Sequence, residues 1–333
     1  MDTGLEPGTI LRDRYEILSL IGQGGMGAVY KAADKRLPGR ICAVKETWPP
    51  PGLAGEALGD TRDQFLREAS TLARLDHPNL PKVSDYYTLV PPGQNTVSRD
   101  YLVMDYVAGQ DLEQIAQQAR RDGRFLNERE ILGWMDQLCD ALTYLHSQDP
   151  PVLHRDVKPA NVKLTPEGRI KLVDFGLVKP LDPTDPNTVT GLRGLGSLPY
   201  TPIEQYAGET AHTDRRSDLY SLGATLYHLL TGLTPANAQE RFLDSQALRR
   251  PREVNPAISP GLEEAVLAAM ALHPKDRPVS VDAWHGMLTG ESVMAPGAYS
   301  RQEESWAQAL QANWWLILVA LVVIGAAVAL TFR

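Results

Sequence analysis

Two segments near the start of the chain carry residues suited to binding a polyphosphate. Residues 22–29 read Gly-Gln-Gly-Gly-Met-Gly-Ala-Val, and glycines lack the side chains that keep a backbone away from phosphate groups. Residues 42–45 form a β-favouring run that ends in Lys45, whose ammonium could point at phosphate oxygens. Glu68 could hold this lysine through an ion pair. A glycine-rich surface turn, a solvated lysine and a surface glutamate are the alternatives.

The strongest chemical signal lies further along the chain. Residues 154–161 read His-Arg-Asp-Val-Lys-Pro-Ala-Asn, and residues 174–176 read Asp-Phe-Gly. Two such motifs in this order are not expected by chance. With the glycine-rich turn and Lys45, they resemble the signature set of the eukaryotic-like (Hanks-type) serine/threonine protein kinase family. The ordered match runs from about Tyr15 to about Leu288, and the wording of the glycine-rich turn is most similar to bacterial membrane-anchored members.

The resemblance implies a division of labour in phosphoryl transfer, which depends on positioning and charge neutralisation. Lys45 is implied to engage the α and β phosphates of ATP, with Glu68 orienting it. Asp156 is implied to orient or accept the proton of the substrate hydroxyl. Lys158 is implied to neutralise charge that develops on the γ-phosphate.

The same resemblance implies the cofactors and their ligands. Asn161 and Asp174 are implied to bind Mg²⁺, which prefers carboxylate and amide oxygens, with Mn²⁺ as a substitute. Adenine is implied to lie between two lobes, bonded to the backbone of the 105–107 segment under an apolar roof. The residues implied to contact ATP are Ile21, Gly22, Gly24, Gly27, Val29, Ala43, Lys45, Met104, Asp105 and Val107.

The segment between Gly176 and Pro202 is the implied activation segment. A phosphate here could pair with the guanidinium of Arg155, which directly precedes Asp156. We expect autophosphorylation in trans, with Thr188 or Thr190 as the favoured sites. The segment also contains Thr184 and Ser197, and solvated loop threonines are the alternative.

One motif departs from the family pattern. The Ala-Pro-Glu of the family stands here as Pro202-Ile203-Glu204. Glu204 retains the glutamate of this motif, and we expect it to pair with Arg277 and brace the large lobe. We also expect Asp218 to be buried and to bond the backbone of the catalytic loop.

The elements that must position these residues are first a sheet and then helices. Strand patterns cover 15–20, 28–31, 40–45, 83–89 and 101–106, and a helical pattern covers 61–75. Beyond Gly109 the patterns turn mainly helical, at 112–121, 128–147, 218–231 and 262–272, with a hairpin at 162–173. The expected fold is α+β and bilobal, like that of protein kinases. Its parts are an extension (1–14), a small lobe (15–107), a large lobe (108–289) and a linker (290–313).

The last residues of the given sequence differ in composition from the rest of the chain. Residues 314–332 carry no charged side chain, and at about 1.5 Å per residue they would span roughly 28 Å, close to the hydrocarbon thickness of a bilayer. They predict one transmembrane helix, and a buried core helix is the alternative. Because ATP is cytosolic, we expect a single-pass protein of the cell membrane with both lobes in the cytoplasm. Gly325 and Ala329 could support weak helix pairing in a transient homodimer.

The composition limits the classes of partner that we expect for this chain. Lys and Arg number 33 against 41 Asp and Glu, for a formal net charge of -8, which argues against a nucleic-acid partner. The 2 cysteines show no zinc spacing. The expected partners are therefore protein substrates carrying serine or threonine. A nucleotide-binding pseudokinase scaffold and a small-molecule phosphotransferase are the alternative functions.

Overall fold

The computed structural model describes residues 4–25, 27–48, 56–90, 98–174, 195–206 and 213–290. The predicted transmembrane segment and the linker before it lie outside these residues. None of the helices within the described part of the chain is long and apolar enough to cross a membrane.

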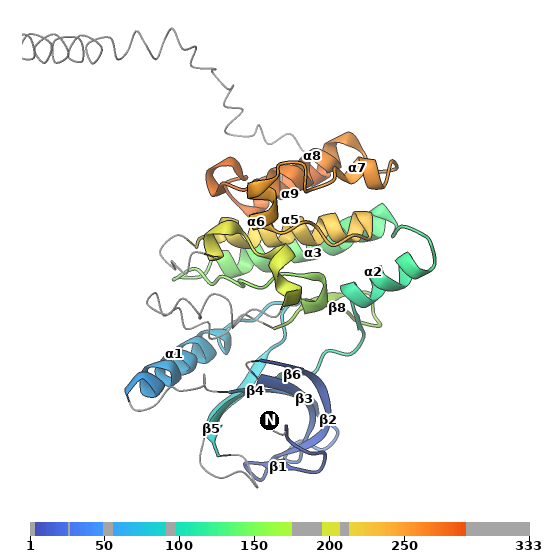
Figure 1. Cartoon of the computed structure of the whole chain (residues 1–333). Coiled ribbons are helices and arrows are strands. Elements are labelled where there is room, and N and C mark those ends of the chain that lie inside the picture. The colour runs from blue at the N-terminus through green and yellow to red at the C-terminus, as the bar shows by residue number, and fades with distance from the viewer. Residues whose placement is uncertain are drawn as a thin grey trace, which may run out of the picture. The chain divides into compact units, whose positions relative to one another are not determined.

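The first part of the chain forms a curled antiparallel sheet (Figure 1). Its strands follow the order β1-β2-β3-β4-β6-β5. Their bounds are β1 Ile10–Leu11, β2 Tyr15–Gly24, β3 Gly27–Asp34, β4 Ile41–Thr47, β5 Val83–Leu89 and β6 Arg99–Asp105. All five strands expected from the sequence are present. The sheet begins earlier than predicted, because residues of the expected N-terminal extension form β1 and pair with β2 through Ile10 and Glu16.

The helix of this lobe, α1, runs over Glu56–Leu72. It begins and ends earlier than the predicted range of 61–75. The last turn tightens, since the N–H of Leu75 bonds to the carbonyl of Leu72 rather than continuing the α-helical ladder. Phe65, Ala69 and Leu72 face the core, and α1 packs against β5 and β6.

The two faces of the sheet bury different clusters. Ala43 lies in one cluster with Phe65 and Ala69 of α1, whereas Cys42 and Val44 lie in the other. Side chains alternate along a strand, so Glu46 is on the same face of β4 as Cys42 and Val44. The first cluster continues into the large lobe as one core. The second is closed by the N-terminal residues, including Leu5 and Leu11. Lys45 and Glu46 therefore lie on opposite faces of β4.

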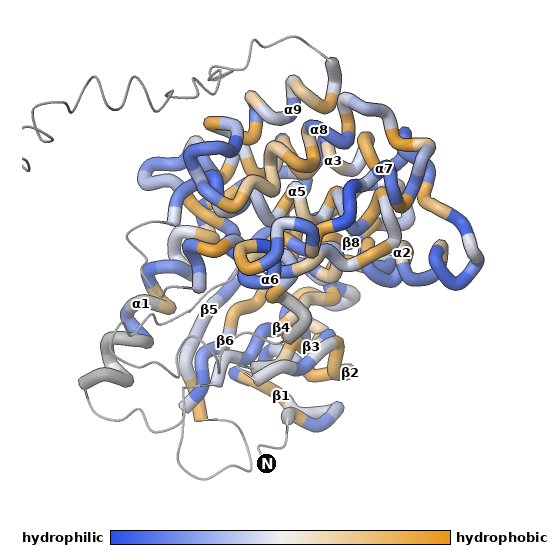
Figure 2. The backbone as a smooth tube through the Cα atoms, turned by 45° about the horizontal axis from the view of Figure 1, so that its top comes forward, coloured by the Kyte–Doolittle hydropathy of each residue, from blue (hydrophilic) through white to orange (hydrophobic). Residues whose placement is uncertain are grey.

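The large lobe is mainly helical. Its helices are α2 Leu112–Arg121, α3 Glu128–His146, α5 Arg215–Thr231, α6 Ala238–Leu243, α7 Pro251–Val254, α8 Pro260–Ala269 and α9 Val281–Thr289. Short 3₁₀ turns lie at η1 Pro159–Asn161, η2 Leu195–Tyr200, η3 Ile203–Gln205 and η5 Pro274–Asp276. A small sheet combines β7 Gln110–Asp111, β8 Val162–Leu164 and β9 Ile170–Leu172. Figure 2 shows apolar residues concentrated on the inner helices, with α2 mostly hydrophilic.

Helix ends explain the differences from the predicted ranges. Helix α5 begins at Arg215 because the side chain of Asp214 caps it, and it ends where Gly232 adopts a φ of 67°. Ser259 caps α8, which starts two residues before the predicted point. Helix α9 was missed by the sequence analysis, although Ser280 and Gly290 cap its two ends. The predicted order of a β-rich lobe and then a helical lobe is confirmed.

The segment between α1 and β5 belongs to the large lobe by its contacts. Asn79 donates its side-chain amide to Gln137 Oε1 and to the carbonyl of Ile170, both at 2.9 Å. Its own carbonyl accepts the N–H of Leu172 at 2.8 Å. Asn79 is therefore pinned to α3 and β9, while the chain on both sides of it belongs to the small lobe.

Candidate active site

The catalytic-loop backbone is held by a carboxylate from α5. Asp218 is fully buried and accepts the N–H of His154 at 2.9 Å and the N–H of Arg155 at 2.7 Å. His146 Nε2 lies 2.9 Å from the same carboxylate. Burial alone would raise the pKa of Asp218, but the hydrogen bond with His146 and its other polar neighbours lower it overall. The predicted role of Asp218 is confirmed, whereas the contribution of His146 was not foreseen.

These bonds hold Arg155 in a left-handed conformation, with a φ of 63°. A residue with a side chain adopts this region at a cost, so it persists where its surroundings fix it. The two backbone bonds to Asp218 supply that restraint. Asp156 follows directly in the chain, so its direction is set by the same anchor.

Three of the predicted site residues lie in hydrogen-bonding contact. Lys158 Nζ lies 2.9 Å from Asp156 Oδ2. Asn161 Nδ2 donates to the same oxygen at 2.9 Å and to the carbonyl of Asp156 at 2.8 Å. The orientation of the Asp156 carboxylate is therefore fixed from two sides.

Asp174 is connected to this group through the backbone. The N–H of Val173 donates to the carbonyl of Asn161 at 2.8 Å, and His154 Nε2 lies 3.2 Å from the carbonyl of Val173. Asp174 has a φ of 58°, which turns the chain at this point. The next two residues of its motif lie outside the described residues.

Lys45 of the small lobe contacts Asp174 of the large lobe. Its Nζ lies 3.2 Å from Asp174 Oδ1. The charge of Lys45 lowers the pKa of Asp174, against the opposing effect of burial. The predicted partner of Lys45 was Glu68, which lies half-buried on α1; that pairing stays a prediction.

The glycine-rich turn forms the tip of the β2–β3 hairpin. Gly24 pairs with Gly27, and Gly22 pairs with Val29. A β-carbon on Gly27 would overlap the carbonyl oxygen of Glu46, so β3 approaches β4 too closely for any other residue. The turn therefore joins two strands, in agreement with the strand patterns predicted on both sides of the glycines.

The predicted adenine-contacting residues lie on the β2–β3 hairpin, on β4 and at the end of β6. Ala43 pairs with Met104 across β4 and β6, and Ile21 and Val29 lie on the adjoining hairpin. The N–H of Asp105 donates to the carbonyl of Lys82 at 3.0 Å. Val107 follows in the short connection that leads to β7.

The end of the implied activation segment is anchored to α5. Ser221 Oγ donates to the carbonyl of Tyr200 at 2.7 Å, and the hydroxyl of Tyr200 lies 2.6 Å from His228 Nδ1. The hydroxyl of Tyr206 donates to the carbonyl of Leu198 at 3.0 Å. Thr184, Thr188 and Thr190 lie outside the described residues, so their predicted modification stays a prediction.

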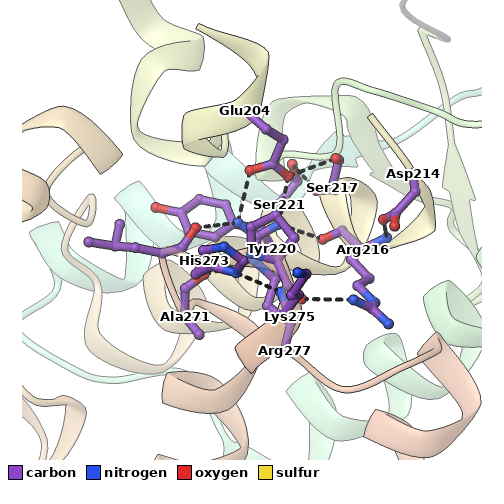
Figure 3. Close-up of polar contacts among 12 residues, drawn as sticks. Glu204, Asp214, Arg216, Ser217, Tyr220, Ser221, Ala271, His273, Lys275 and Arg277 are labelled. Atoms are coloured by element: carbon purple, nitrogen blue, oxygen red, sulfur yellow. Dashed lines mark hydrogen bonds and ion pairs between the residues drawn. The ribbon is translucent and has the colours of Figure 1, made fainter. Parts of the chain in front are cut away.

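Glu204 and Arg277 form the predicted ion pair (Figure 3). The guanidinium donates to the two carboxylate oxygens at 2.7 and 3.0 Å. Ser217 Oγ donates to Glu204 at 2.8 Å, and the guanidinium lies over the ring of Tyr220 at 5.0 Å. Ser217 and Tyr220 were not foreseen as partners, although both belong to the Ser-Asp-Leu-Tyr run around Asp218. The replaced proline of the family motif leaves the brace intact.

Asn161 and Asp174 are suited to a small hard cation. Both offer oxygen donors, and the Val173 to Asn161 hydrogen bond keeps the two residues close. No cluster of three or more His, Cys, Asp or Glu side chains within the described residues is placed to hold a metal ion. The donor chemistry of the two residues fits Mg²⁺ when a ligand contributes further oxygens.

Comparison with known proteins agrees with this geometry. The protein kinase domain family matches residues 15–285. The chain is 33% identical over 302 residues to serine/threonine-protein kinase pkn3 of Myxococcus xanthus, covering 86% of this chain and 51% of that protein. It is 36% identical over 257 residues to serine/threonine-protein kinase PknA of Mycobacterium tuberculosis, covering 77% of this chain and 55% of that protein. The chain thus spans about half the length of these curated relatives.

Solved structures resemble the fold over the same region. PpkA-294 in its apo form is 29% identical with a TM-score of 0.68, covering 86% of this chain and 100% of that one. The kinase domain of PknI of Mycobacterium tuberculosis is 28% identical with a TM-score of 0.63, covering 87% and 100%. From its motifs, its fold and the family match over residues 15–285, the chain belongs to the protein kinase domain family.

Proposed function

We propose that this chain transfers the γ-phosphoryl group of ATP to serine or threonine hydroxyls of proteins. The observation that carries the proposal is the 3.2 Å contact between Lys45 and Asp174. It joins a cation of the small lobe to an acid of the large lobe, next to the bonded group of Asp156, Lys158 and Asn161. Phosphoryl transfer needs this combination of charges in a fixed arrangement.

Each residue then has a distinct task. Lys45 binds the α and β phosphates, and Glu68 orients it from α1. Asp156, held at Oδ2 by Lys158 and Asn161, directs the acceptor hydroxyl and receives its proton. Lys158 stabilises negative charge that develops on the transferred group.

Asn161 and Asp174 would hold Mg²⁺, and Mn²⁺ can replace it. Bound there, the ion supplies neutralisation of phosphate charge. The depressed pKa of Asp174 keeps its carboxylate ionised at neutral pH, which is the form that binds a cation.

Adenine binding uses the segment after β6. Since the N–H of Asp105 already donates to the carbonyl of Lys82 at 3.0 Å, its carbonyl is the group that meets the nucleotide. The N–H of Val107 supplies the second contact. Ile21, Val29 and Ala43 cover the ring, beside Met104 at the gatekeeper position, and the hairpin glycines Gly22, Gly24 and Gly27 cover the phosphates.

Transfer of radiolabelled phosphate from ATP to a generic protein acceptor tests the proposal. We expect the wild type to label the acceptor on serine and threonine, and Asp156→Asn to lose this activity while it still binds ATP. Asp122→Asn, at the exposed end of α2, is the matched control and should transfer phosphate like the wild type. A folded wild type that binds ATP but labels no acceptor would instead indicate a nucleotide-binding scaffold.

The proposal extends to regulation and location. Autophosphorylation in trans at Thr188 or Thr190 raises activity by bringing a phosphate to Arg155. The uncharged stretch 314–332 inserts in the cell membrane, keeps both lobes in the cytoplasm and favours transient homodimers. Phosphopeptide mapping of the wild type beside Asp156→Asn tests the first part, and carbonate extraction of membranes from cells that express the chain with and without 314–332 tests the second.

A further inference from the structure

The residue next to Lys45 is a fully buried carboxylate. Glu46 has 0% exposed surface and lies on the face of β4 opposite to Lys45. A buried carboxylate is costly unless hydrogen-bond donors surround it. The residues around it show how that cost is met.

Glu46 accepts hydrogen bonds on both of its carboxylate oxygens. Oε1 lies 2.9 Å from Arg99 Nη1 and accepts the hydroxyl of Tyr101 at 2.8 Å. Oε2 accepts the hydroxyl of Tyr30 at 3.1 Å and the indole N–H of Trp48 at 3.0 Å. Tyr30 belongs to β3, and both Arg99 and Tyr101 belong to β6. One carboxylate thus ties β4 to both neighbouring strands.

The network extends beyond the three strands. The N–H of Leu5 donates to the hydroxyl of Tyr30 at 2.9 Å, which joins the N-terminal residues to the same group. The Arg99 guanidinium lies over the ring of Trp48 at 5.7 Å. The carbonyl of Glu46 is the atom that a β-carbon on Gly27 would overlap. Both the side chain and the backbone of Glu46 therefore touch elements that shape the nucleotide site.

The tyrosines that bond to Glu46 belong to an apolar cluster that also contains Val44 and Val103. An apolar side chain could fill such a place without the cost of burying a charge. A polar group that is fully bonded adds direction instead, because its bonds are satisfied in only one register of the strands. Glu46 pairs with Tyr101 and Ala28, so the adjacent Lys45 pairs with Leu102 and Val29. Bonds that fix the strand pairing of Glu46 therefore also fix the strand pairing of Lys45.

We propose that Glu46 is a positioning residue for Lys45. Its bonds to Arg99, Tyr101, Tyr30 and Trp48 set the register and twist of β4, and thereby the place where the Lys45 ammonium meets the phosphates. This inference rests on the proposed function, since it assumes that Lys45 binds the phosphates of ATP. The proposal predicts that Glu46 affects the binding of the phosphates and not the binding of the adenosine moiety, because only the phosphates contact Lys45.

Binding of Mg·ATP and of adenosine to the full chain, measured by calorimetry, tests the proposal. Glu46→Gln keeps the size of the side chain but cannot accept from donors on both sides. We expect it to weaken ATP relative to adenosine by roughly three- to tenfold, the effect of about one hydrogen bond. Tyr30→Phe removes one donor and keeps the ion pair with Arg99, so it should shift the ratio in the same direction by a smaller factor and serves if Glu46→Gln does not fold.

The matched control is Tyr15→Phe. Tyr15 is fully buried in the same cluster and donates its hydroxyl to Asp85 at 2.9 Å, away from Glu46. It should lower the melting temperature as Tyr30→Phe does, yet leave the ratio of ATP to adenosine affinity at the wild-type value. In a Lys45→Met background, Glu46→Gln should still lower the melting temperature but no longer change the ratio.

The outcomes distinguish a failure of the positioning role from a failure of the proposed function. If the wild type prefers ATP to adenosine and neither Glu46→Gln nor Tyr30→Phe changes that preference, the positioning role is wrong and the proposed function stands. An equal change of the ratio in Tyr15→Phe, or one that persists without Lys45, also overturns it. A folded wild type that binds ATP no better than adenosine contradicts the proposed use of Lys45 itself.

Discussion

The carboxylate of Asp218 on α5 accepts the backbone N–H of Arg155 at 2.7 Å while Arg155 holds a φ of 63°. A helix of the large lobe therefore fixes the conformation of the residue that precedes Asp156. Because the same carboxylate also accepts the N–H of His154 at 2.9 Å, the two bonds depend on one side chain. A change at Asp218 should affect both stability and turnover.

Asp218→Asn tests this dependence. The amide has one acceptor oxygen, and its NH₂ group would face a backbone donor, so a buried N–H is left without a partner. We expect a loss of about 3 kcal/mol in the free energy of unfolding, together with a fall in kcat. Denaturant unfolding and steady-state kinetics measure the two effects.

The matched control is Asp282→Asn on α9. Asp282 accepts the hydroxyl of Thr143 at 2.7 Å at an exposed position, so its loss should change neither quantity appreciably. An Asp218→Asn variant as stable and as active as this control would show that the loop holds its conformation without the carboxylate.

Arg277→Lys tests the brace of the large lobe. The side chain of Arg277 is 0% exposed and donates to both oxygens of Glu204. Lysine cannot make this bidentate contact, so we expect a loss of about 3 kcal/mol in the free energy of unfolding. Lys82→Met, which removes an exposed contact with Asp76 at 3.5 Å, should leave unfolding close to that of the wild type. Equal melting temperatures for the two variants would contradict the brace.

Gly109→Ala tests the junction between the lobes. Gly109 has a φ of 115°, and a β-carbon there would overlap the carbonyl oxygen of Leu164 on β8. We expect a loss of about 2 to 4 kcal/mol in the free energy of unfolding. Gly123→Ala separates strain from overlap, because Gly123 has a φ of 68° and no atom within 4 Å of the added carbon. That variant should lose only about 1 kcal/mol, and a loss as large as that of Gly109→Ala would remove the role of Leu164.

The stability of the chain should fall in mild acid, in part through His228. Burial, with a smaller effect from Arg120, lowers the pKa of His228 to about 4, against about 6.5 in an unfolded chain. Between these values the unfolded chain binds a proton that the folded chain does not. Stability is therefore fully present above about pH 6.5 and is lost as the pH falls towards 4, by roughly 3 kcal/mol for this group.

Denaturant unfolding at several pH values measures this effect. His228→Asn keeps an acceptor near the hydroxyl of Tyr200 but does not titrate, so its stability should depend less steeply on pH between about 4 and 6.5. Tyr200→Phe removes the hydroxyl that lies 2.6 Å from His228 but leaves the ring buried, so the acid loss should remain. The same pH dependence in the wild type and in His228→Asn would exclude His228 as a source of the loss.

The site could be predicted from the sequence as far as its motifs extend. Asp156, Lys158 and Asn161 lie within eight residues of one another in the chain, and their residue types limit the chemistry they can perform. The Glu204 to Arg277 ion pair was predicted across a long separation because the family resemblance supplied it. The contact of Lys45 with Asp174 was not predicted, since neither motif indicates whether the ammonium of Lys45 approaches Asp174 or Glu68.

Residues outside motifs could not be found in this way. Glu46 reads in the sequence as a polar residue after Lys45, and its donors Tyr30 and Arg99 are distant in the chain. Their meeting depends on strand order, which places β4 between β3 and β6. The start of α1 at Glu56 was missed because Gly59 and the nearby prolines read as a loop.

The bonds of Asn79 to Gln137 and Ile170 anchor the chain that follows α1 to the large lobe. Of the two ends of α1, the Leu72 end is therefore the one nearer in the chain to this anchor. At about 1.5 Å per residue, Glu68 lies roughly 6 Å from this end and Glu56 roughly 24 Å. A rotation of α1 about its Leu72 end that moves Glu68 would therefore move Glu56 about four times as far.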